Sequence, residues 1–231
     1  MKQFFKFMFA SMLGTLLSII LGIIILFLIV LGAVSSVSKD KEVFIPTHSV
    51  LILKLDEPIK ERSSGNPFEN FDYTSFSPEP TLGLNDILES IKNAKNDKRI
   101  KGIYLELSSI PAGIGTIEEI RNAIIDFKSS KKFVLAFSES YSQTAYYLAS
   151  AANEIYLYPE GILDFRGLKA EMAFFKGALD KLEVEPQIIR HGKFKSAVEP
   201  LIMDKMSPEN RAQFTSFLNS IWSYLVMNIS H

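Results

Sequence analysis

The distribution of apolar residues divides the chain into two parts. No charged residue occurs between Phe7 and Ser38, and Met8–Val34 is an almost uninterrupted apolar run of 27 residues. A helix needs about 20 apolar residues to cross a bilayer, so this run can span one with some tilt. A core helix would carry a polar stripe, which this run lacks. We therefore expect a transmembrane anchor over residues 1–38 and a separate domain over residues 39–231.

The charges on either side of the apolar run predict its orientation. Lys2 and Lys6 precede it, whereas the balanced run Lys39-Asp40-Lys41-Glu42 follows it. The positive-inside rule then keeps the N-terminus cytoplasmic, and the main domain is translocated. A cleavable signal peptide has a shorter apolar region of about 7 to 15 residues, although cleavage near Ala33-Val34-Ser35 is an open alternative.

Beyond the anchor, short β-branched runs alternate with longer helical stripes, the pattern of an α/β protein. The expected strands are short and mostly apolar, which is typical of burial on both faces: Val50–Leu55, Ile100–Leu107, Phe133–Phe137, Glu154–Tyr158 and Gln187–Arg190. The expected helices follow apolar positions at a helical spacing: Leu84–Ile91, Ile117–Phe127, Gln143–Ala152, Leu168–Leu182 and a last one that begins at Ser207-Pro208. Thr116 and Glu119 have the spacing of a capping box at the start of the second helix.

One long segment, Arg62–Pro80, follows neither period. It contains four aromatic residues among Ser, Gly, Asn and Pro: Phe68, Phe71, Tyr73 and Phe76. Two interpretations stay open for a loop of this length. It is either a solvated connection or a flap or subunit contact that uses the aromatic side chains.

Composition excludes several classes of function. Lys plus Arg is 25 against 26 Asp plus Glu, a net charge of -1, so no broad cationic surface is available for nucleic acid. The chain has no Cys, which excludes disulfides, thiolate metal sites and a cysteine nucleophile. The three His residues are far apart in the sequence, without the spacing of metal ligands. We expect neither a metal nor a cofactor.

Taken alone, the polar motifs are weak evidence for a site. Gly113 and Gly115 precede a helix and could present backbone N–H groups to an anion, but an ordinary turn uses the same residues. Three serines follow a predicted strand and none has the Gly-x-Ser-x-Gly pattern of a nucleophile elbow: Ser138, Ser140 and Ser142. Glu118 and Glu119 are adjacent on a helix and point to different sides, which favours a capping and solvated role.

Two lysines, Lys193 and Lys195, follow the last predicted strand. A lysine at such a position is usually a surface charge. To act as a base it must lose its proton near neutral pH, which requires lowering a pKa of about 10.4 by about three units, or about 4 kcal/mol. Burial in an apolar pocket can supply that change.

The run Lys193-Phe-Lys-Ser-Ala-Val-Glu-Pro200, followed by Met206-Ser-Pro-Glu, closely resembles the N-terminal half of the long form of the signal peptide peptidase A (protease IV) family. Three further segments are similar to that family: Asp97–Gly102, Tyr141–Ser150 and Ile155–Gly161. The resemblance covers essentially the whole chain, including the N-terminal anchor.

This resemblance implies a ClpP/crotonase-like fold of β-β-α units after one transmembrane helix. It implies a homo-oligomeric serine protease of the bacterial inner membrane, with its main domain periplasmic, that cuts remnant signal peptides with a Ser/Lys dyad. Lys195 matches the family's general base, which takes a proton from the serine and returns it to the leaving amine. We therefore expect Lys195 to be buried and Lys193 to face outward.

The chain departs from the family pattern at the nucleophile. That serine lies in a Ser-Gly-Gly motif of a second, homologous half, whereas the corresponding segment here is Ser142-Gln143-Thr144, with Gln143 at the position of the nucleophile. The helical pattern of apolar residues also continues close to the last residue of the chain, His231. We expect a fragment that supplies the base and is inactive alone. The alternative is a non-catalytic, membrane-anchored oligomerisation domain of the same fold.

Overall fold

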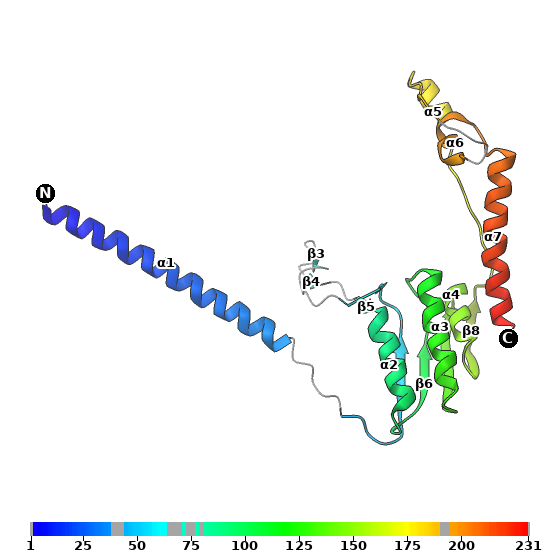
Figure 1. Cartoon of the computed structure of the whole chain (residues 1–231), viewed down its shortest axis with the longest axis horizontal. Coiled ribbons are helices and arrows are strands. Elements are labelled where there is room, and N and C mark those ends of the chain that lie inside the picture. Colours follow the sequence, from blue (N-terminus) through cyan, green and yellow to red (C-terminus); the bar gives the residue numbers. More distant parts are fainter. Residues whose placement is uncertain are drawn as a thin grey trace. The chain divides into compact units, whose positions relative to one another are not determined.

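The computed structural model describes residues 2–37, 44–63, 71–72, 77–78, 81–189 and 195–230 (Figure 1). The chain divides into two units, Met1–Ile45 and Pro46–His231. Each unit is described by itself.

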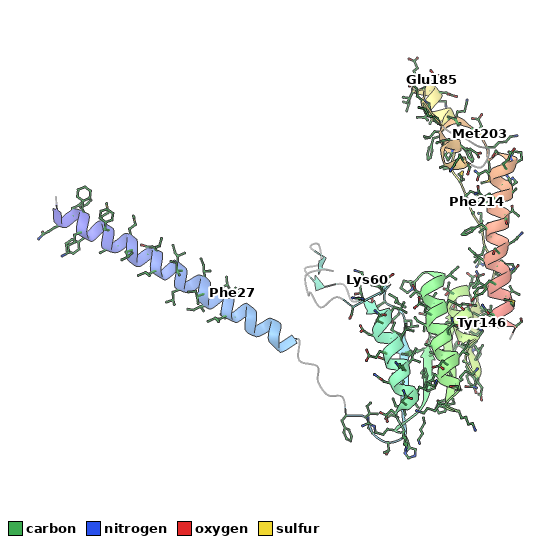
Figure 2. The ribbon with its side chains drawn as sticks, in the orientation of Figure 1. Phe27, Lys60, Tyr146, Glu185, Met203 and Phe214 are labelled. Atoms are coloured by element: carbon green, nitrogen blue, oxygen red, sulfur yellow. The ribbon has the colours of Figure 1, made fainter. Side chains whose placement is uncertain are left out.

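The first unit is dominated by one long helix, α1 (Lys2–Val37). Its stretch Gln3–Ile29 is long and apolar enough to cross a membrane, and its side chains, such as Phe27, are exposed (Figure 2). Two hydroxyls inside the stretch bond to the helix backbone: Thr15 Oγ1 donates to Ser11 O at 2.6 Å, and Ser18 Oγ donates to Thr15 O at 2.9 Å. These polar groups therefore need no water, which suits them to lipid.

The second unit is built on a parallel sheet in the order β1-β6-β7-β8. Its strands are β1 (Ser49–Lys54), β6 (Ile100–Glu106), β7 (Phe133–Tyr141) and β8 (Glu154–Leu163). Two short pairs lie outside this sheet: β2 (Ile59–Lys60) with β5 (Leu82–Gly83), and β3 (Phe71–Asp72) with β4 (Ser77–Pro78).

Three helices connect consecutive strands of the main sheet: α2 (Leu84–Asn96), α3 (Ile114–Lys128) and α4 (Gln143–Ala149). Each connection moves one strand along the sheet in the same direction, so right-handed crossovers place all three helices on one face (Figure 1). The core between helices and sheet consists of apolar side chains with no exposed surface: Ile103, Leu105, Ile120, Ile124, Phe127, Val134 and Ala136. The α/β class is confirmed, and the sheet agrees with the ClpP/crotonase-like fold that the resemblance implies.

The opposite face of the sheet is apolar but exposed. Ile52 and Tyr104 are paired in the register, as are Phe137 and Tyr156, and 56% of Ile52 and 51% of Tyr156 are exposed. Parallel sheets are normally covered on both faces. The described part of the chain covers only one.

The edge strand β8 is exposed along nearly its whole length. Its Ile155 and Leu157 point toward the helix layer, where Ala136 and Ser138 beside them are buried, yet both remain partly exposed. Hence α4 covers β7 more completely than it covers the edge strand.

The last helices form the C-terminal part of this unit. They are α5 (Lys176–Lys181), the 3-10 turn η1 (Ser196–Val198), α6 (Glu199–Ile202) and α7 (Pro208–Ile229). The predicted start of α7 is confirmed, because the Ser207 side chain accepts a hydrogen bond from Asn210 N at 3.1 Å.

Buried polar contacts fix the far end of α7 on α3 and α4. Arg121 Nη2 donates to Asn228 O at 2.5 Å, which places a cation at the C-terminus of α7, and Asn228 Nδ2 donates to Tyr147 Oη at 3.0 Å. Glu118 accepts hydrogen bonds from the hydroxyls of Tyr147 and Tyr224. Glu118 therefore ties three helices together, and its predicted capping and solvated role is wrong.

Several predicted boundaries are also wrong. No strand forms at residues 187–189, where Ile189 is fully exposed and has no neighbouring strand to pair with; Arg190 lies outside the described residues. The helix predicted for Leu168–Leu182 is limited to α5, because residues 168–175 run without helical structure. Helix α3 begins at Ile114 with Gly113 as its N-cap, so Thr116 is inside the helix and forms no capping box.

The predicted loop Arg62–Pro80 contains the short strands β3 and β4. Phe68, Tyr73 and Phe76 lie outside the described residues. Its two interpretations, solvated connection or contact segment, stay predictions.

We predict that Gly161→Ala destabilises the sheet edge. A Cβ at this position would lie 2.3 Å from Glu139 O, a backbone atom that cannot move freely. We expect a loss of about 1–3 kcal/mol of unfolding free energy in urea, followed through the fluorescence of the single Trp222. Gly115→Ala is the matched control, because open space surrounds Gly115, and it should change the value by less than about 1 kcal/mol. Equal effects of the two substitutions would contradict the tight β7–β8 contact.

The same fold predicts a loss of stability at alkaline pH. Burial and the hydrogen bond to Glu118 raise the pKa of Tyr147 to about 12 from its usual 10.0, so the folded state holds a proton that the unfolded state releases. Stability should fall as the pH rises from 10.0 toward 12, and Tyr147→Phe should make this fall shallower. Burial also raises the pKa of Tyr141 to about 12, so part of the fall remains. An identical slope in Tyr147→Phe, measured by urea unfolding across this range, would show that Tyr147 is not the source.

Candidate functional site

Lys195 directly precedes the turn η1 and helix α6. The N–H of Glu199 donates to Ser196 O and closes the turn, so the backbone after Lys195 is hydrogen-bonded at once. Its side chain is exposed, and the predicted burial of Lys195 is therefore wrong for the single chain. The physical reason is that an amine loses water only under apolar surface packed over it, and the described part of this chain places none there. Lys193 lies outside the described residues, so its orientation stays a prediction.

The three serines after β7 all serve local structure. Ser138 Oγ is buried, donates to Ser140 O at 2.8 Å and accepts from Ser140 N at 3.0 Å, which stabilises the irregular register between β7 and β8. Ser140 Oγ donates to Ile162 O at 3.1 Å. Ser142 is the N-cap of α4 and accepts from Ala145 N at 3.3 Å. None of the three is held near Lys195 by a contact that the structure describes.

Gln143 occupies the predicted position of the nucleophile and has a structural contact there. Its Oε1 accepts a hydrogen bond from Gly167 N at 2.9 Å, which fastens the segment after β8 to the start of α4. Gly167 has a φ of 102°, a conformation that favours glycine. The amide of Gln143 is neither a base nor a nucleophile. Its role among the described contacts is to hold the backbone at Gly167 against the start of α4.

A small cavity of about 70 Å³ lies beside Gln143. Almost all of its lining is apolar, from the starts of α3 and α4 and from the two segments that pack on them: Ile114, Ile117, Gln143, Thr144, Tyr147, Leu168 and Leu225. It has room for a small apolar group. It contains no pair of nucleophile and base among the described residues, so it is not by itself a catalytic centre.

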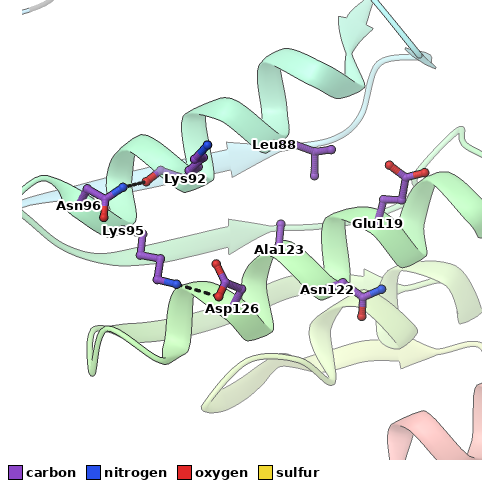
Figure 3. Close-up of a pocket in the computed structure, with 8 residues that line it drawn as sticks. All are labelled: Leu88, Lys92, Lys95, Asn96, Glu119, Asn122, Ala123 and Asp126. Carbon is purple, nitrogen blue, oxygen red and sulfur yellow. Dashed lines mark hydrogen bonds and ion pairs between the residues drawn. The ribbon is translucent and has the colours of Figure 1, made fainter.

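Two of the larger hollows are also unsuited to catalysis. A groove of about 470 Å³ runs between α2 and α3, where Lys95 forms an ion pair with Asp126 at 2.7 Å and Asn96 Nδ2 donates to Lys92 O (Figure 3). A second hollow of about 250 Å³ lies at the carboxyl ends of β1, β6 and β7. There the hydrogen bond to Glu106 raises the pKa of Lys54, which favours the charged ammonium over a base.

One lysine does have a lowered pKa. Burial lowers the pKa of Lys132, but its ammonium donates to the carbonyls of Ala94 and Asp97 at 2.6 and 2.7 Å. Ala94 lies in the last turn of α2 and Asp97 is the C-cap of this helix, so Lys132 caps a helix C-terminus. Its role is structural, and Lys195 stays the candidate base.

Comparison with known proteins identifies a matching family and related sequences. Residues 126–231 match Peptidase family S49. Protease 4 of Haemophilus influenzae is 42% identical over 146 residues, and Protease 4 of Salmonella typhi is 40% identical over 148 residues. A chloroplastic serine protease of Arabidopsis thaliana, SPPA, is 34% identical over 149 residues. These matches include 63%, 64% and 64% of this chain, respectively.

The relatives are much longer than the matched segment. It corresponds to 24% of each of the two bacterial proteins and to 22% of the plant protein. The chain therefore spans about a quarter of the length of the curated relatives that it matches. Most of each relative lies outside the region compared.

We predict that Ser142 contributes a helix cap and no nucleophile. Ser142→Ala removes the acceptor for Ala145 N and should lower the unfolding free energy by about 1 kcal/mol. A fluorophosphonate probe, which reacts with activated serine hydroxyls, should leave Ser138, Ser140 and Ser142 unmodified when the labelled chain is digested and analysed by mass spectrometry. Stoichiometric labelling of Ser142 that Lys195→Ala abolishes would show a complete dyad in this chain and contradict the assignment.

Proposed function

We propose that this chain is the base-bearing part of a membrane-anchored serine peptidase, because residues 126–231 match Peptidase family S49. The observation that carries this proposal is the match itself, which includes Lys195 and the hydrogen-bonded turn that follows it. Lys195 is the general base, and a serine outside the described residues is the nucleophile.

The proposed chemistry assigns two proton transfers to Lys195. The neutral amine takes the proton from the serine hydroxyl while the oxygen attacks the peptide carbonyl, and a tetrahedral intermediate forms. The resulting ammonium then gives its proton to the amine of the peptide as the C–N bond breaks, which leaves an acyl-enzyme. Water, activated by the same amine, hydrolyses the acyl-enzyme. An exposed ammonium cannot begin this sequence efficiently, so Lys195 must be covered in the active enzyme.

The exposed sheet face supports this requirement for a cover. Ile52, Tyr104 and Tyr156 form part of an apolar surface that the helices leave open. We propose that a homologous half carrying Ser-Gly-Gly, in the same or another polypeptide of a homo-oligomer, covers this unit and supplies both the nucleophile and the apolar surface over Lys195. The whole peptidase then forms only on assembly.

We propose that the substrates are apolar peptides at the membrane, such as remnants of signal peptides. Helix α1 would anchor the peptidase with its N-terminus in the cytoplasm and its main domain in the periplasm of a bacterial inner membrane. An extended peptide can add to the exposed edge strand β8 through backbone hydrogen bonds. Because α1 would hold the peptidase at the bilayer, the peptidase would meet mainly apolar peptides.

A second function is favoured by the exposure of Lys195 and by the structural roles of the three serines. In this alternative the chain is a non-catalytic anchored domain that binds copies of itself. The two functions make opposite predictions for substitution of the lysine.

We predict that Lys195→Met lowers kcat for cleavage of an apolar peptide by at least about 100-fold, because the general base is lost while the length of the side chain is kept. The measurement uses the detergent-solubilised chain mixed with a separately expressed homologous half that carries Ser-Gly-Gly. Lys195→Arg should be equally inactive, since a guanidinium stays protonated.

Lys205→Met is the matched control, because Lys205 is an exposed lysine ten positions further along the chain. It should retain activity within about twofold. Cleavage that persists in Lys195→Met would remove Lys195 from the mechanism. No cleavage by the unmodified mixture, with self-association of the chain retained, would favour the non-catalytic alternative.

A further inference from the structure

Glu199 is a charged residue buried in the second unit, with 1% of its surface exposed. It follows Lys195 by one turn and opens helix α6. Its Oε1 accepts a hydrogen bond from Ser207 Oγ at 2.6 Å, and its Oε2 accepts from Ser207 N at 3.2 Å and from Asn210 Nδ2 at 2.9 Å. These three donors come from the start of α7.

The residue after Glu199 joins a third segment. Phe175 N donates to the carbonyl of Pro200, the residue after Glu199, at 2.7 Å. Asn210 also approaches the sulfur of Met172 at 3.9 Å. The segment before α5, the turn after Lys195 and the start of α7 therefore meet around one carboxylate. Met203, the C-cap of α6, marks this junction in Figure 2.

We propose that Glu199 is the positioning residue for Lys195. It does not touch the reacting atoms. It holds the turn η1 against the long helix α7. The hydrogen bond from Glu199 N to Ser196 O connects Glu199 to the residue directly after Lys195, and so restricts the position of Lys195. A general base must lie within about 3 Å of the hydroxyl it deprotonates, and a displacement of about 1 Å can cost about 100-fold in rate.

Burial of the carboxylate suits this role. An isolated carboxylate is expensive to bury, and three hydrogen bonds from a helix start offset that cost. The start of α7 also carries the positive end of the helix dipole, which favours a negative group there. Deletion of the carboxylate leaves Ser207 and Asn210 with donors that have lost their acceptor, so the anchoring cannot be replaced by local adjustment.

This inference rests on the proposed function for its catalytic part, whereas its anchoring part can be tested without any activity. The first measurement is amide hydrogen exchange of the full chain in detergent. In Glu199→Ala, the amides of Phe175, Ser207 and Asn210 should exchange at least tenfold faster, while those in α3 stay unchanged. Glu199→Gln should lie within threefold of the unmodified chain, because the amide oxygen accepts from Ser207 N and Asn210 and its NH2 donates to Ser207 Oγ.

The second measurement is peptide cleavage by the chain assembled with the homologous Ser-Gly-Gly half. Glu199→Ala should lower kcat by 10- to 100-fold and change KM by less than twofold, and Glu199→Gln should restore most of the rate. Glu185→Ala, which removes an exposed carboxylate on another segment, should have no effect. If Glu199→Ala also accelerates exchange in α3, its effect is not confined to the start of α7, and Ser207→Ala is used in its place. Ser207→Ala is a smaller change that should also accelerate exchange at Asn210 and lower kcat.

The outcomes separate the two claims. Unchanged exchange in Glu199→Ala overturns the anchoring. Loss of cleavage in Lys195→Met together with full kcat in Glu199→Ala overturns the positioning role and leaves the base in place. Faster exchange in Glu199→Ala with full cleavage in Lys195→Met overturns the proposed function and leaves Glu199 as an anchor of α7 alone.

Discussion

A parallel β-sheet must bury both of its faces, and this requirement governs the second unit of the chain. Helices α2, α3 and α4 cover one face and enclose side chains such as Ile103 and Val134 completely. The other face presents Ile52 and Tyr156, each about half exposed, to solvent. Large apolar surface of this kind is the usual mark of a protein contact. The sheet therefore specifies where further protein should bind before any catalytic residue is considered.

Lys195 is also exposed in the described part of the chain. Amine chemistry near neutral pH depends on removal of water, and removal of water depends on apolar surface that is packed over the nitrogen. The described residues anchor the turn after Lys195 through Glu199 and the start of α7, but they place no apolar surface over the lysine. The positioning of the Lys195 amine and its desolvation are thus separate contributions to catalysis. We infer that this chain supplies the positioning and that its assembly partner supplies the desolvation.

Local periodicity was sufficient to predict most of the fold. The apolar stripes of α2 and α3, the strands β1 and β6 and the Ser207-Pro208 helix start all depend on residues near one another in the sequence. Residues 187–189 do not form the predicted strand because no strand of the described chain pairs with them. Residues 168–175 do not form the predicted helix and instead make contacts with distant residues, such as that of Met172 with Asn210, which no local pattern indicates.

The candidate site was less accessible to prediction. Lys195 was found only through the resemblance of its run to a family, since its position alone marks it as an ordinary surface charge. The burial of Glu199 depends on Ser207 and Asn210, 8 and 11 residues further along the chain, and no local pattern indicates that contact. The sequence shows only an acidic residue four positions after the candidate base. The position of Gln143 at the expected site of the nucleophile stays a prediction, and its hydrogen bond to Gly167 is visible only in the structure.

The most direct test of the account is the accessibility of the Lys195 amine before and after assembly. A bulky amine-reactive reagent is applied to the chain alone and to the chain in a complex that cleaves peptides, and modification is quantified by mass spectrometry. The account predicts that Lys195 reacts like the exposed Lys205 in the chain alone and becomes slower by about tenfold or more in the active complex, while Lys205 stays unchanged. Equal reactivity of Lys195 in both states, in a complex that cleaves peptides, would contradict it.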